Sequence, residues 1–465
     1  MTTRTRPHVL VVGGGYVGMY TALRLQRRLR DVEAAITVVD PQSYMTYQPF
    51  LPEAAAGSVE PRHVVVPLRR VLHRCRILSA RVTGVDHANR VATIDPVGEE
   101  PPYELSYDVL VMAPGSVART LPIPGLAEQA IGFKTVGEAI WLRNHVINRL
   151  ELAATTQDRE RRRRALTFCF IGGGYAGIEA FAELEDMARD ALRYYPGLQP
   201  SDMRWVMVEA TGRVLPEVSP DMGVYTLDRL RERGMEVLLE TRVESVEGGL
   251  VQLSDGQRFE ADTVVWTAGV RPNPLLRNTD LPLDERDRLK ATAFLTVDGV
   301  EDAWTAGDCA AVPDLSKQQP GALCGPSAQH AVRQAKRLAD NLVASLRGEP
   351  MKEYEHAYAG SVASLGLHKG VAEVYGVRLK GYPAWLMHRA YHMSRVPTLN
   401  RKVRVVADWT IDLFFRREIV SLGALQNPRE EFVRAAQPPS RGGTSTAQPE
   451  PRLEVPASTG TSVAS

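Results

Sequence analysis

The most constraining feature of this sequence is a strand, glycine turn and helix unit that occurs twice. In the first copy, an apolar run at residues 8–12 precedes Gly-Gly-Gly-Tyr-Val-Gly at residues 13–18, and a helical pattern follows. In the second copy, a run at residues 166–171 precedes Gly-Gly-Gly-Tyr-Ala-Gly at residues 172–177. Buried strands that alternate with amphipathic helices predict an α/β fold. The duplication predicts two such units rather than one continuous sheet.

Each glycine turn has the G-x-G-x-x-G spacing of a dinucleotide-binding loop. The first glycine makes a tight turn, the second lets the backbone approach a pyrophosphate, and the third lets the helix pack closely. The phosphates then meet N–H groups at the positive end of the helix. The glycines in these roles are Gly13, Gly15 and Gly18, and then Gly172, Gly174 and Gly177. One such loop is weak evidence, but two in the same context predict two dinucleotides.

An acid at the end of the strand after each loop can accept hydrogen bonds from ribose hydroxyls. Asp40 comes 22 residues after the last glycine of its loop, which is about the usual distance. Glu209 comes 32 residues after its own, and a loop insertion around residues 194–201 accounts for the excess. Glu209 should repel a 2′-phosphate and favour NADH over NADPH, whereas Arg213 nearby leaves NADPH open.

Composition limits the other classes of protein. The chain has 465 residues, too many for one hydrophobic core, and its net charge of +1 excludes a nucleic-acid polycation. The apolar run near the N-terminus, residues 9–12, is too short for a signal peptide, and no run is long enough for a transmembrane helix, so we expect a cytoplasmic protein. No metal-ligand spacing occurs, and we expect no metal site. Residues 159–164, a run of charges, are expected to form a solvated loop.

Four further motifs resemble those of one family. Residues 46–52 look like its flavin-side loop, and residues 107–116 look like its YDxLVxAxGS strand, with Pro114 in the place of threonine. Residues 264–270 match a second such strand, and residues 305–308 look like an xxGD motif. On these motifs and the two loops, the chain resembles the type II NADH dehydrogenases, which are single-chain, non-pumping NADH:quinone oxidoreductases among the two-dinucleotide-binding-domain flavoproteins.

The resemblance implies two Rossmann-like dinucleotide-binding domains, with the NAD domain inserted in the FAD domain, followed by a C-terminal amphipathic segment. FAD is expected at the first loop and NADH at the second. The implied boundaries are 1–125 and 291–355 for the two parts of the FAD-binding domain, 126–290 for the NAD(H)-binding domain, 356–436 for a membrane-contact or interface segment, and 437–465 for a disordered tail. Beyond the loops and their acids, the implied cofactor-binding residues are Gln48, Ala113, Gly115, Gly269, Gly307 and Asp308.

Three residues are predicted to be catalytic. The resemblance places Glu179, two residues after the second loop, near the nicotinamide and the flavin; without it, a first-turn acid that complements the helix dipole is an equal alternative. Residues 328–335 resemble the family's AQxAxQQG helix, which runs under the flavin and borders the quinone pocket. Gln329 is expected to meet the flavin, and Arg333 stands where the family usually has glutamine. Arg333 could favour a reduced quinone or select another acceptor.

The cysteines argue against a thiol relay. Cys75, Cys169, Cys309 and Cys324 are scattered, and none of them forms the short-spaced pair that a disulfide beside a flavin requires. Disulfide reductases and sulfide:quinone oxidoreductases are therefore disfavoured. We expect electrons to pass directly from the cofactor to an acceptor.

Residues 378–417 are basic and aromatic, with nine lysines and arginines against two acids, for a net charge of +7. Val406, Trp409, Leu413 and Phe414 follow helical spacing. Such a segment suits a helix on a lipid surface, and a capping helix or homodimer interface is the alternative. His388, Arg389, His392 and Arg395 interrupt the amphipathic pattern. We predict peripheral contact with the inner face of the cell membrane.

The predicted function is transfer of electrons from NADH through FAD to a quinone. Two alternatives remain open from the residues: a soluble flavoprotein reductase with another small-molecule or protein acceptor, and a flavin-based redox sensor. Steady-state oxidation of NADH separates them, since a sensor would be reduced once and then stop.

Overall fold

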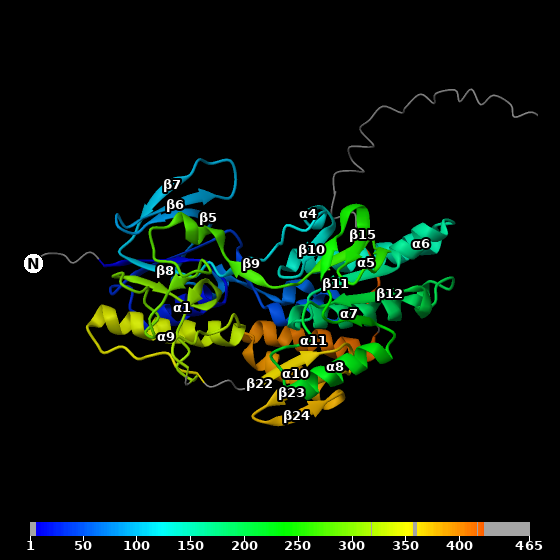
Figure 1. Cartoon of the computed structure of the whole chain (residues 1–465). Helices are drawn as coiled ribbons and strands as arrows, with labels where there is room; N and C mark the ends of the chain where they lie inside the picture. Colours follow the sequence, from blue (N-terminus) through cyan, green and yellow to red (C-terminus); the bar gives the residue numbers. More distant parts are fainter. Residues whose placement is uncertain (1–5, 318, 357–359, 416, 423–465) are drawn as a thin grey trace, which may run out of the picture. The chain divides into compact units, whose positions relative to one another are not determined.

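The computed structural model describes residues 6–317, 319–356, 360–415 and 417–422. The first glycine loop belongs to a seven-stranded sheet (Figure 1). In sheet order its strands are β20 (Ala303–Thr305), β8 (Val109–Met112), β1 (His8–Val12), β2 (Ala35–Asp40), β5 (Arg76–Asp86), β6 (Val91–Pro96) and β7 (Tyr103–Ser106). The strands from β20 to β5 are parallel, and β6 and β7 continue the sheet antiparallel.

The second glycine loop belongs to a separate sheet of five parallel strands. In sheet order they are β10 (Ala130–Gly132), β17 (Thr263–Trp266), β11 (Thr167–Ile171), β12 (Arg204–Val208) and β13 (Glu236–Leu238). All five come from the chain between β8 and β20, so one Rossmann-like unit is inserted in the other, as predicted. The order β8-β1-β2 recurs as β17-β11-β12, and each loop leaves the middle strand of its three.

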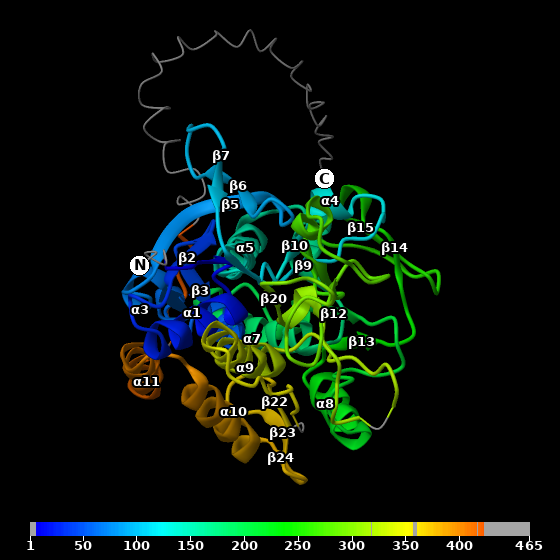
Figure 2. The same cartoon turned by 90° about the vertical axis from the view of Figure 1, so that its left-hand side faces the viewer.

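Eleven α-helices lie within the described residues. They are α1 (Tyr16–Arg28), α2 (Leu51–Ala55), α3 (Leu68–Val71), α4 (Leu126–Gln129), α5 (Val136–Thr155), α6 (Arg159–Ala165), α7 (Tyr175–Ala191), α8 (Pro220–Glu232), α9 (Ala328–Arg347), α10 (Tyr382–Arg395) and α11 (Leu399–Phe414). Smaller strands pair as β3 (Tyr44–Thr46) with β4 (Val65–Pro67), β9 (Ser116–Ala118) with β18 (Val270–Pro272), and β19 (Leu289–Lys290) with β21 (Ala310–Ala311). A further sheet has the order β14 (Val243–Ser245), β15 (Leu250–Leu253), β16 (Arg258–Glu260). Helix α1 lies against α9 (Figure 2).

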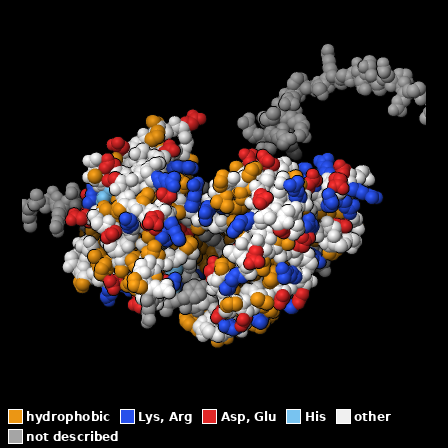
Figure 3. All heavy atoms as spheres, in the orientation of Figure 1, with side chains coloured by type: hydrophobic (Ala, Val, Ile, Leu, Met, Phe, Trp, Pro, Cys, Tyr) orange, Lys and Arg blue, Asp and Glu red, His pale blue; other side chains and the backbone are white. Residues whose placement is uncertain are grey.

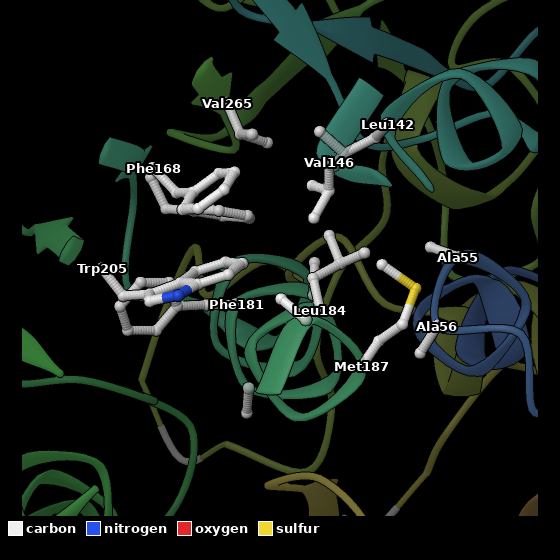
Figure 4. Close-up of a cluster of buried hydrophobic side chains, with 14 of the residues drawn as sticks. Ala55, Ala56, Leu142, Val146, Phe168, Phe181, Leu184, Met187, Trp205 and Val265 are labelled. Atoms are coloured by element: carbon white, nitrogen blue, oxygen red, sulfur yellow. The ribbon is translucent and has the colours of Figure 1, made fainter. Parts of the chain in front are cut away.

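Of the two helices that follow the glycine loops, α7 is more deeply buried than α1. Figure 4 shows Phe181, Leu184 and Met187 of α7 within one apolar cluster. Side chains of β11, β12 and β17, of α5, and of the end of α2 surround them. A helix that is apolar on several faces must be covered by other elements, and α7 is covered in this way by both the sheet and α2.

The C-terminal part forms more structure than the sequence predicted. A three-stranded antiparallel sheet, β22 (Gly360–Ser364), β23 (Gly370–Val374) and β24 (Val377–Lys380), precedes α10 and α11. Helix α10 packs on β22 and β23, and β22 contacts α7. No described helix has the length and apolar character needed to cross a bilayer. The tail predicted from residue 437 onward lies outside the described residues.

The prediction of a loop at residues 159–164 was wrong, because these residues form α6. Asp158 caps the helix: its Oδ1 accepts hydrogen bonds from the N–H groups of Glu160 and Arg161. Arginines in the last turn favour the negative end of the helix dipole. The run is nevertheless mostly solvent-exposed, and its cations belong to a face on which charges of both signs are mixed (Figure 3).

Candidate active site

The first glycine loop has the geometry that the spacing predicts. Gly13 has φ +99°, in the region that favours glycine, and a Cβ on Gly18 would lie 1.8 Å from the Gly13 carbonyl oxygen. A Cβ on Gly15, in contrast, would meet nothing within 4 Å among the described residues. Gly15 is the N-cap of α1, and no side chain caps this helix end. The N–H groups therefore face open space, where a pyrophosphate fits.

The second loop repeats this geometry. Gly172 has φ +110°, and a Cβ on Gly177 would lie 1.9 Å from the Gly172 carbonyl oxygen. The site of a Cβ on Gly174 is open, and Gly174 is the uncapped N-cap of α7. The two loops therefore have equivalent geometry, and each is open at the N-terminus of its helix.

The two predicted ribose acids lie at the loops, where each also accepts a backbone hydrogen bond. Asp40 Oδ2 accepts from the Gly14 N–H at 2.6 Å, and burial raises the pKa of Asp40. Glu209 Oε2 accepts from the Gly173 N–H at 2.5 Å. Asp40 Oδ1 also accepts from the Gln42 N–H, and Glu209 Oε1 accepts from the N–H and the hydroxyl of Thr211, so only the remaining lone pairs suit ribose hydroxyls. Arg213 is the cation that could have accommodated the 2′-phosphate of NADPH. Its guanidinium donates to the carbonyl oxygen of Val218 and is therefore engaged within its own loop.

Gln48 and Asp308, which were predicted to lie around the flavin, are connected through Lys134 and Ser116, which were not predicted. Ser116 Oγ donates to Asp308 Oδ2 at 2.6 Å, and Lys134 Nζ donates to Ser116 Oγ at 2.6 Å. Gln48 Nε2 donates to the Lys134 carbonyl oxygen at 3.2 Å. Burial lowers the pKa of Lys134, against the opposing pull of the nearby Asp308. The donors and acceptors suit a polar, hydroxyl-bearing group such as the ribityl chain of FAD.

The other predicted cofactor residues are backbone positions. The Ala113 N–H donates to Val12 at 2.9 Å, and a Cβ on Gly13 would lie 2.3 Å from the Ala113 carbonyl oxygen. Gly115, Gly269 and Gly307 all have positive φ. Each follows a sheet strand, so these glycines turn the chain at the carboxyl ends of the strands, where ligands of α/β sheets bind.

Glu179 is buried with 6% of its surface exposed and lies just past the first turn of α7, which contains no acid, so the alternative of a first-turn acid at the helix dipole was wrong. Its Oε1 accepts a hydrogen bond from the Ser364 N–H at 2.8 Å and lies 3.0 Å from His388 Nε2. Gln329 Nε2 donates to the Gly360 carbonyl oxygen at 2.9 Å, and Arg333 Nη1 donates to Gln329 Oε1 at 3.2 Å.

The three predicted catalytic residues therefore do not form one cluster: Arg333 contacts Gln329, whereas Glu179 binds elsewhere. Gln329 and Glu179 instead bind opposite ends of β22, at Gly360 and Ser364. The amide of Gln329 already bonds protein groups, and its expected contact with a flavin stays a prediction.

The thiols lack the features of a redox relay. All four cysteines are free, and burial raises the pKa of Cys169 to about 12 and of Cys309 to about 11. A thiol in this state is a poor nucleophile. Cys309 Sγ donates to the carbonyl oxygen of Ala306 at 3.3 Å, which indicates a packed, structural residue. Among the described residues, no group of histidines, cysteines and acids could hold a metal ion.

Sequence reasoning missed several site residues. Lys134 carried no motif, and Ser116, the last residue of the motif at residues 107–116, was given no role of its own. Glu53 on α2 is buried; its Oε2 accepts from Trp409 Nε1 at 2.6 Å and from Arg389 Nη2 at 3.1 Å. The interruption of the amphipathic pattern by His388 and Arg389 was the available signal, because both face inward on α10.

Comparison with known proteins agrees with this arrangement. The model of the pyridine nucleotide-disulphide oxidoreductase family matches residues 7–335. A type II NADH:quinone oxidoreductase of Staphylococcus epidermidis is 31% identical over 82% of this chain and 92% of its own length. A probable NADH dehydrogenase of Dictyostelium discoideum is 29% identical over 89% of this chain and 91% of its own.

Among solved structures, NDH2 of Plasmodium falciparum in complex with NADH matches with a TM-score of 0.82 at 17% identity, covering 89% of this chain and all of that one. The sulfide:quinone oxidoreductase of Aquifex aeolicus shares the fold with a TM-score of 0.67 at 16% identity, over 89% of this chain and 96% of its own. With its duplicated loops, its inserted second sheet and relatives that align over nearly their full length, the chain belongs to the type II NADH dehydrogenases of the pyridine nucleotide-disulphide oxidoreductase family.

Proposed function

We propose that this chain is an FAD-dependent enzyme that oxidises NADH and reduces a quinone. The observation that carries the proposal is the pair of equivalent, open glycine loops in a chain whose four cysteines are free and whose thiol pKa values are raised by burial. Two dinucleotides without a thiol relay suit direct transfer from one cofactor to an acceptor. The family to which the chain belongs supports NADH as donor and quinone as acceptor.

FAD would bind the first loop. Its pyrophosphate would meet the N–H groups at the start of α1, its ribose would bind Asp40, and its ribityl chain would bind Asp308. When bound, FAD supplies two-electron exchange between a hydride donor and an acceptor. Lys134 and Ser116 hold the Asp308 carboxylate in a fixed orientation for this role.

NADH would bind the second loop, with its ribose on Glu209 and its nicotinamide toward Glu179. Glu209 favours NADH, because a 2′-phosphate beside the carboxylate would be repelled. Gln329 and Arg333, at the start of α9, would border the quinone. A cation beside a quinone oxygen favours the reduced, more negative form.

The C-terminal helices would bring the enzyme to its lipophilic acceptor. The outer face of α11 carries an exposed apolar row at helical spacing: Leu399 (77% exposed), Val403 (59%), Val406 (45%), Leu413 (72%) and Phe414 (79%). Exposed Tyr382 and Leu386 of α10 add to it. Neighbouring cations such as Lys402 and Arg404 would each add about 1 kcal/mol on anionic lipid. We propose contact with the inner face of the cell membrane.

Two experiments test these proposals. The first is kinetic: the FAD-loaded full chain should oxidise NADH with ubiquinone or menaquinone faster than with oxygen. A single reduction without turnover would instead indicate a redox sensor. Turnover only with soluble dyes or proteins would indicate a soluble reductase.

The second experiment tests membrane contact by flotation with anionic liposomes. The double variant Val406→Glu with Leu413→Glu should lose binding to the liposomes. Val32→Glu with Val97→Glu, at exposed valines of the first domain, is the matched control. Equal flotation of both double variants would contradict membrane contact through α11.

A further inference from the structure

Two histidines one turn apart on α10 contact side chains from different halves of the molecule. His388 Nε2 lies 3.0 Å from Glu179 Oε1, in the helix after the second glycine loop. His392 Nδ1 lies 3.3 Å from Tyr47 Oη, ahead of η1 (Gln48–Phe50), in the segment after the first ribose acid. The two imidazole centroids are 4.5 Å apart. The pair therefore forms a continuous line of titratable groups between the two dinucleotide-binding units.

His388 is completely enclosed, with 1% of its surface exposed. Burial alone would lower its pKa, but the carboxylates of Glu179, Glu53 and Glu183 outweigh burial and raise the pKa of His388. Neither ring nitrogen has hydrogen-bond geometry with a described residue, and Nε2 meets Glu179 as an ion pair at 3.0 Å. A buried imidazolium with a free N–H next to another ring can give its proton away without moving the backbone.

His392 has the opposite character. Its ring is only partly buried, at the edge of α10, and lies against Phe50 and Tyr391. Burial, together with the cation at His388, holds the pKa of His392 well below its usual value. A neutral ring at the edge and a protonated ring inside are the two states that a stepwise proton transfer requires.

Other charged and titratable groups face this pair from every element packed around it. They are Glu53 on α2, Glu179 and Glu183 on α7, Tyr47 before η1, Arg389, Tyr391 and Arg395 on α10, and Asp412 and Arg417 at the end of α11 and beyond it. Arg389 and Arg417 are engaged with Glu53 and Asp186. His388 is thus the cation in contact with Glu179 that can release a proton, since a guanidinium does not.

The proposed reaction needs one proton from water per turnover. NADH supplies a hydride, and a quinone becomes a hydroquinone by taking that hydride and one additional proton. We propose that His392 and His388 pass this proton from the outer edge of α10 to Glu179, which delivers it to the acceptor. His388 gives its proton to Glu179 and is refilled from His392, which takes a proton from water; each group then returns to its starting state. This inference rests on the proposed function.

The kinetic test compares His388→Gln and His392→Gln in the FAD-loaded full chain. His145→Gln is the matched control, because His145 is also a shielded imidazole, bonded to Thr263 Oγ1 at 2.9 Å on α5, and burial lowers its pKa to about 4. Both α10 variants should lose about 10-fold or more of acceptor-saturated kcat. They should also change its pH profile and enlarge its solvent deuterium isotope effect. NADH consumption in a single turnover without acceptor needs no proton and should stay unchanged.

A second measurement does not depend on turnover. In NMR titration of the FAD-loaded chain, the His388 signal should titrate above the ordinary histidine range and move down in Glu179→Gln, while the His392 signal should stay neutral at mildly acidic pH. Unchanged pH profiles and isotope effects in both variants of an enzyme that does reduce quinones would overturn the inference alone. A wild type that reduces no quinone faster than oxygen would overturn the proposed function, and the NMR titration would still test the charge states of the pair.

Discussion

Helices α1 and α7 follow the two glycine loops and occupy equivalent positions in the two repeats, but their net charges are opposite. Counted from the last glycine of each loop, Tyr20 of α1 corresponds to Glu179 of α7, and Arg24 corresponds to Glu183. Helix α1 contains three arginines and no acid. Helix α7 contains one arginine and five acids, namely Glu179, Glu183, Glu185, Asp186 and Asp190. The loops themselves hardly differ, so the duplication preserved phosphate geometry and changed what each helix can pair with.

The partners of the two helices differ in the same way. The Arg24 guanidinium forms two hydrogen bonds of 2.7 Å with Asp340 on α9, near the surface. The α7 acids are met by cations from later in the chain: Arg233, Lys369, His388 and Arg417. Tyr20 and Glu179 both meet α10, through Arg395 and His388 respectively. The C-terminal part therefore covers α7 and supplies cations that pair with its acids, and it also presents an exposed surface.

The largest expected effect comes from the third glycine of each loop. Gly18→Ala would force a Cβ to within 1.8 Å of the Gly13 carbonyl oxygen, and Gly177→Ala to within 1.9 Å of the Gly172 oxygen. Gly18→Ala should lose bound flavin, whereas Gly177→Ala should keep flavin and bind NADH at least about 100-fold more weakly, or about 2.7 kcal/mol. Flavin content and NADH titration measure this. Gly197→Ala, where a Cβ has open space, is the control. The reverse pattern would exchange the two nucleotides between the loops.

The next effect contrasts the two ion pairs. Arg233 is 12% exposed and pairs with Glu185, which is 1% exposed, and its Nη1 also donates to the Leu365 carbonyl oxygen at 2.6 Å. Arg233→Met should cost about 2 kcal/mol, because Glu185 loses one of its two arginine partners and keeps Arg189. Arg24→Met removes a more exposed pair and should cost under about 1 kcal/mol. Urea unfolding gives both values. Equal costs would mean that the two helices are covered equally well.

A smaller effect is expected at the ribose acids. Glu209→Gln removes the charge that would repel a 2′-phosphate but keeps an acceptor for the Gly173 N–H. The ratio of kcat/KM for NADH over NADPH should fall roughly 10-fold, or about 1.4 kcal/mol. Asp40→Asn at the first loop should weaken flavin retention and leave this ratio unchanged. A ratio that changes in Asp40→Asn instead would assign the nicotinamide cofactor to the first loop.

Much of the fold was predictable because it rests on local patterns. The strands at β1, β2, β11, β12 and β20 are short buried runs, and each glycine loop has a spacing that its geometry enforces. The order of strands β8-β1-β2 and its repeat follow from right-handed crossovers between such runs. The buried runs and the glycine spacings are patterns within a few tens of residues, which periodicity can reveal, although β1 pairs with β8 across 100 residues, as Val9 with Val109.

The rest of the site depends on contacts that no local pattern carries. Lys134 and Ser116 meet Asp308 from distant parts of the chain, and Glu53 on α2 meets Trp409 on α11. The strands β22 to β24 are short and lack a turn signal as strong as the glycine loops. His388 and Arg389 looked like flaws in an amphipathic helix because the acids that they neutralise lie far away in sequence.

The smallest expected effect is on the pH dependence of thermal stability, and it comes from Glu183 on the acidic helix α7. Burial raises the pKa of Glu183 above its ordinary value of 4.5, although Ser364 Oγ donates to its Oε1 at 2.6 Å. The folded chain therefore binds more protons at this site than the unfolded chain, and stability falls as pH rises from about 4.5 through the raised pKa. Glu183→Gln is neutral at every pH and should remove this loss. Its Tm should exceed that of the wild type by roughly 2 °C near pH 8 and by less near pH 5.

The control is Glu128→Gln, on the exposed α4, whose Tm should differ from that of the wild type by the same amount at both pH values. Because Glu183 also raises the pKa of His388, which loses stability with rising pH in the same direction, part of the slope removed belongs to that imidazole. Parallel Tm curves for wild type and Glu183→Gln would mean that Arg417 and His388 keep this carboxyl ionised in the folded chain.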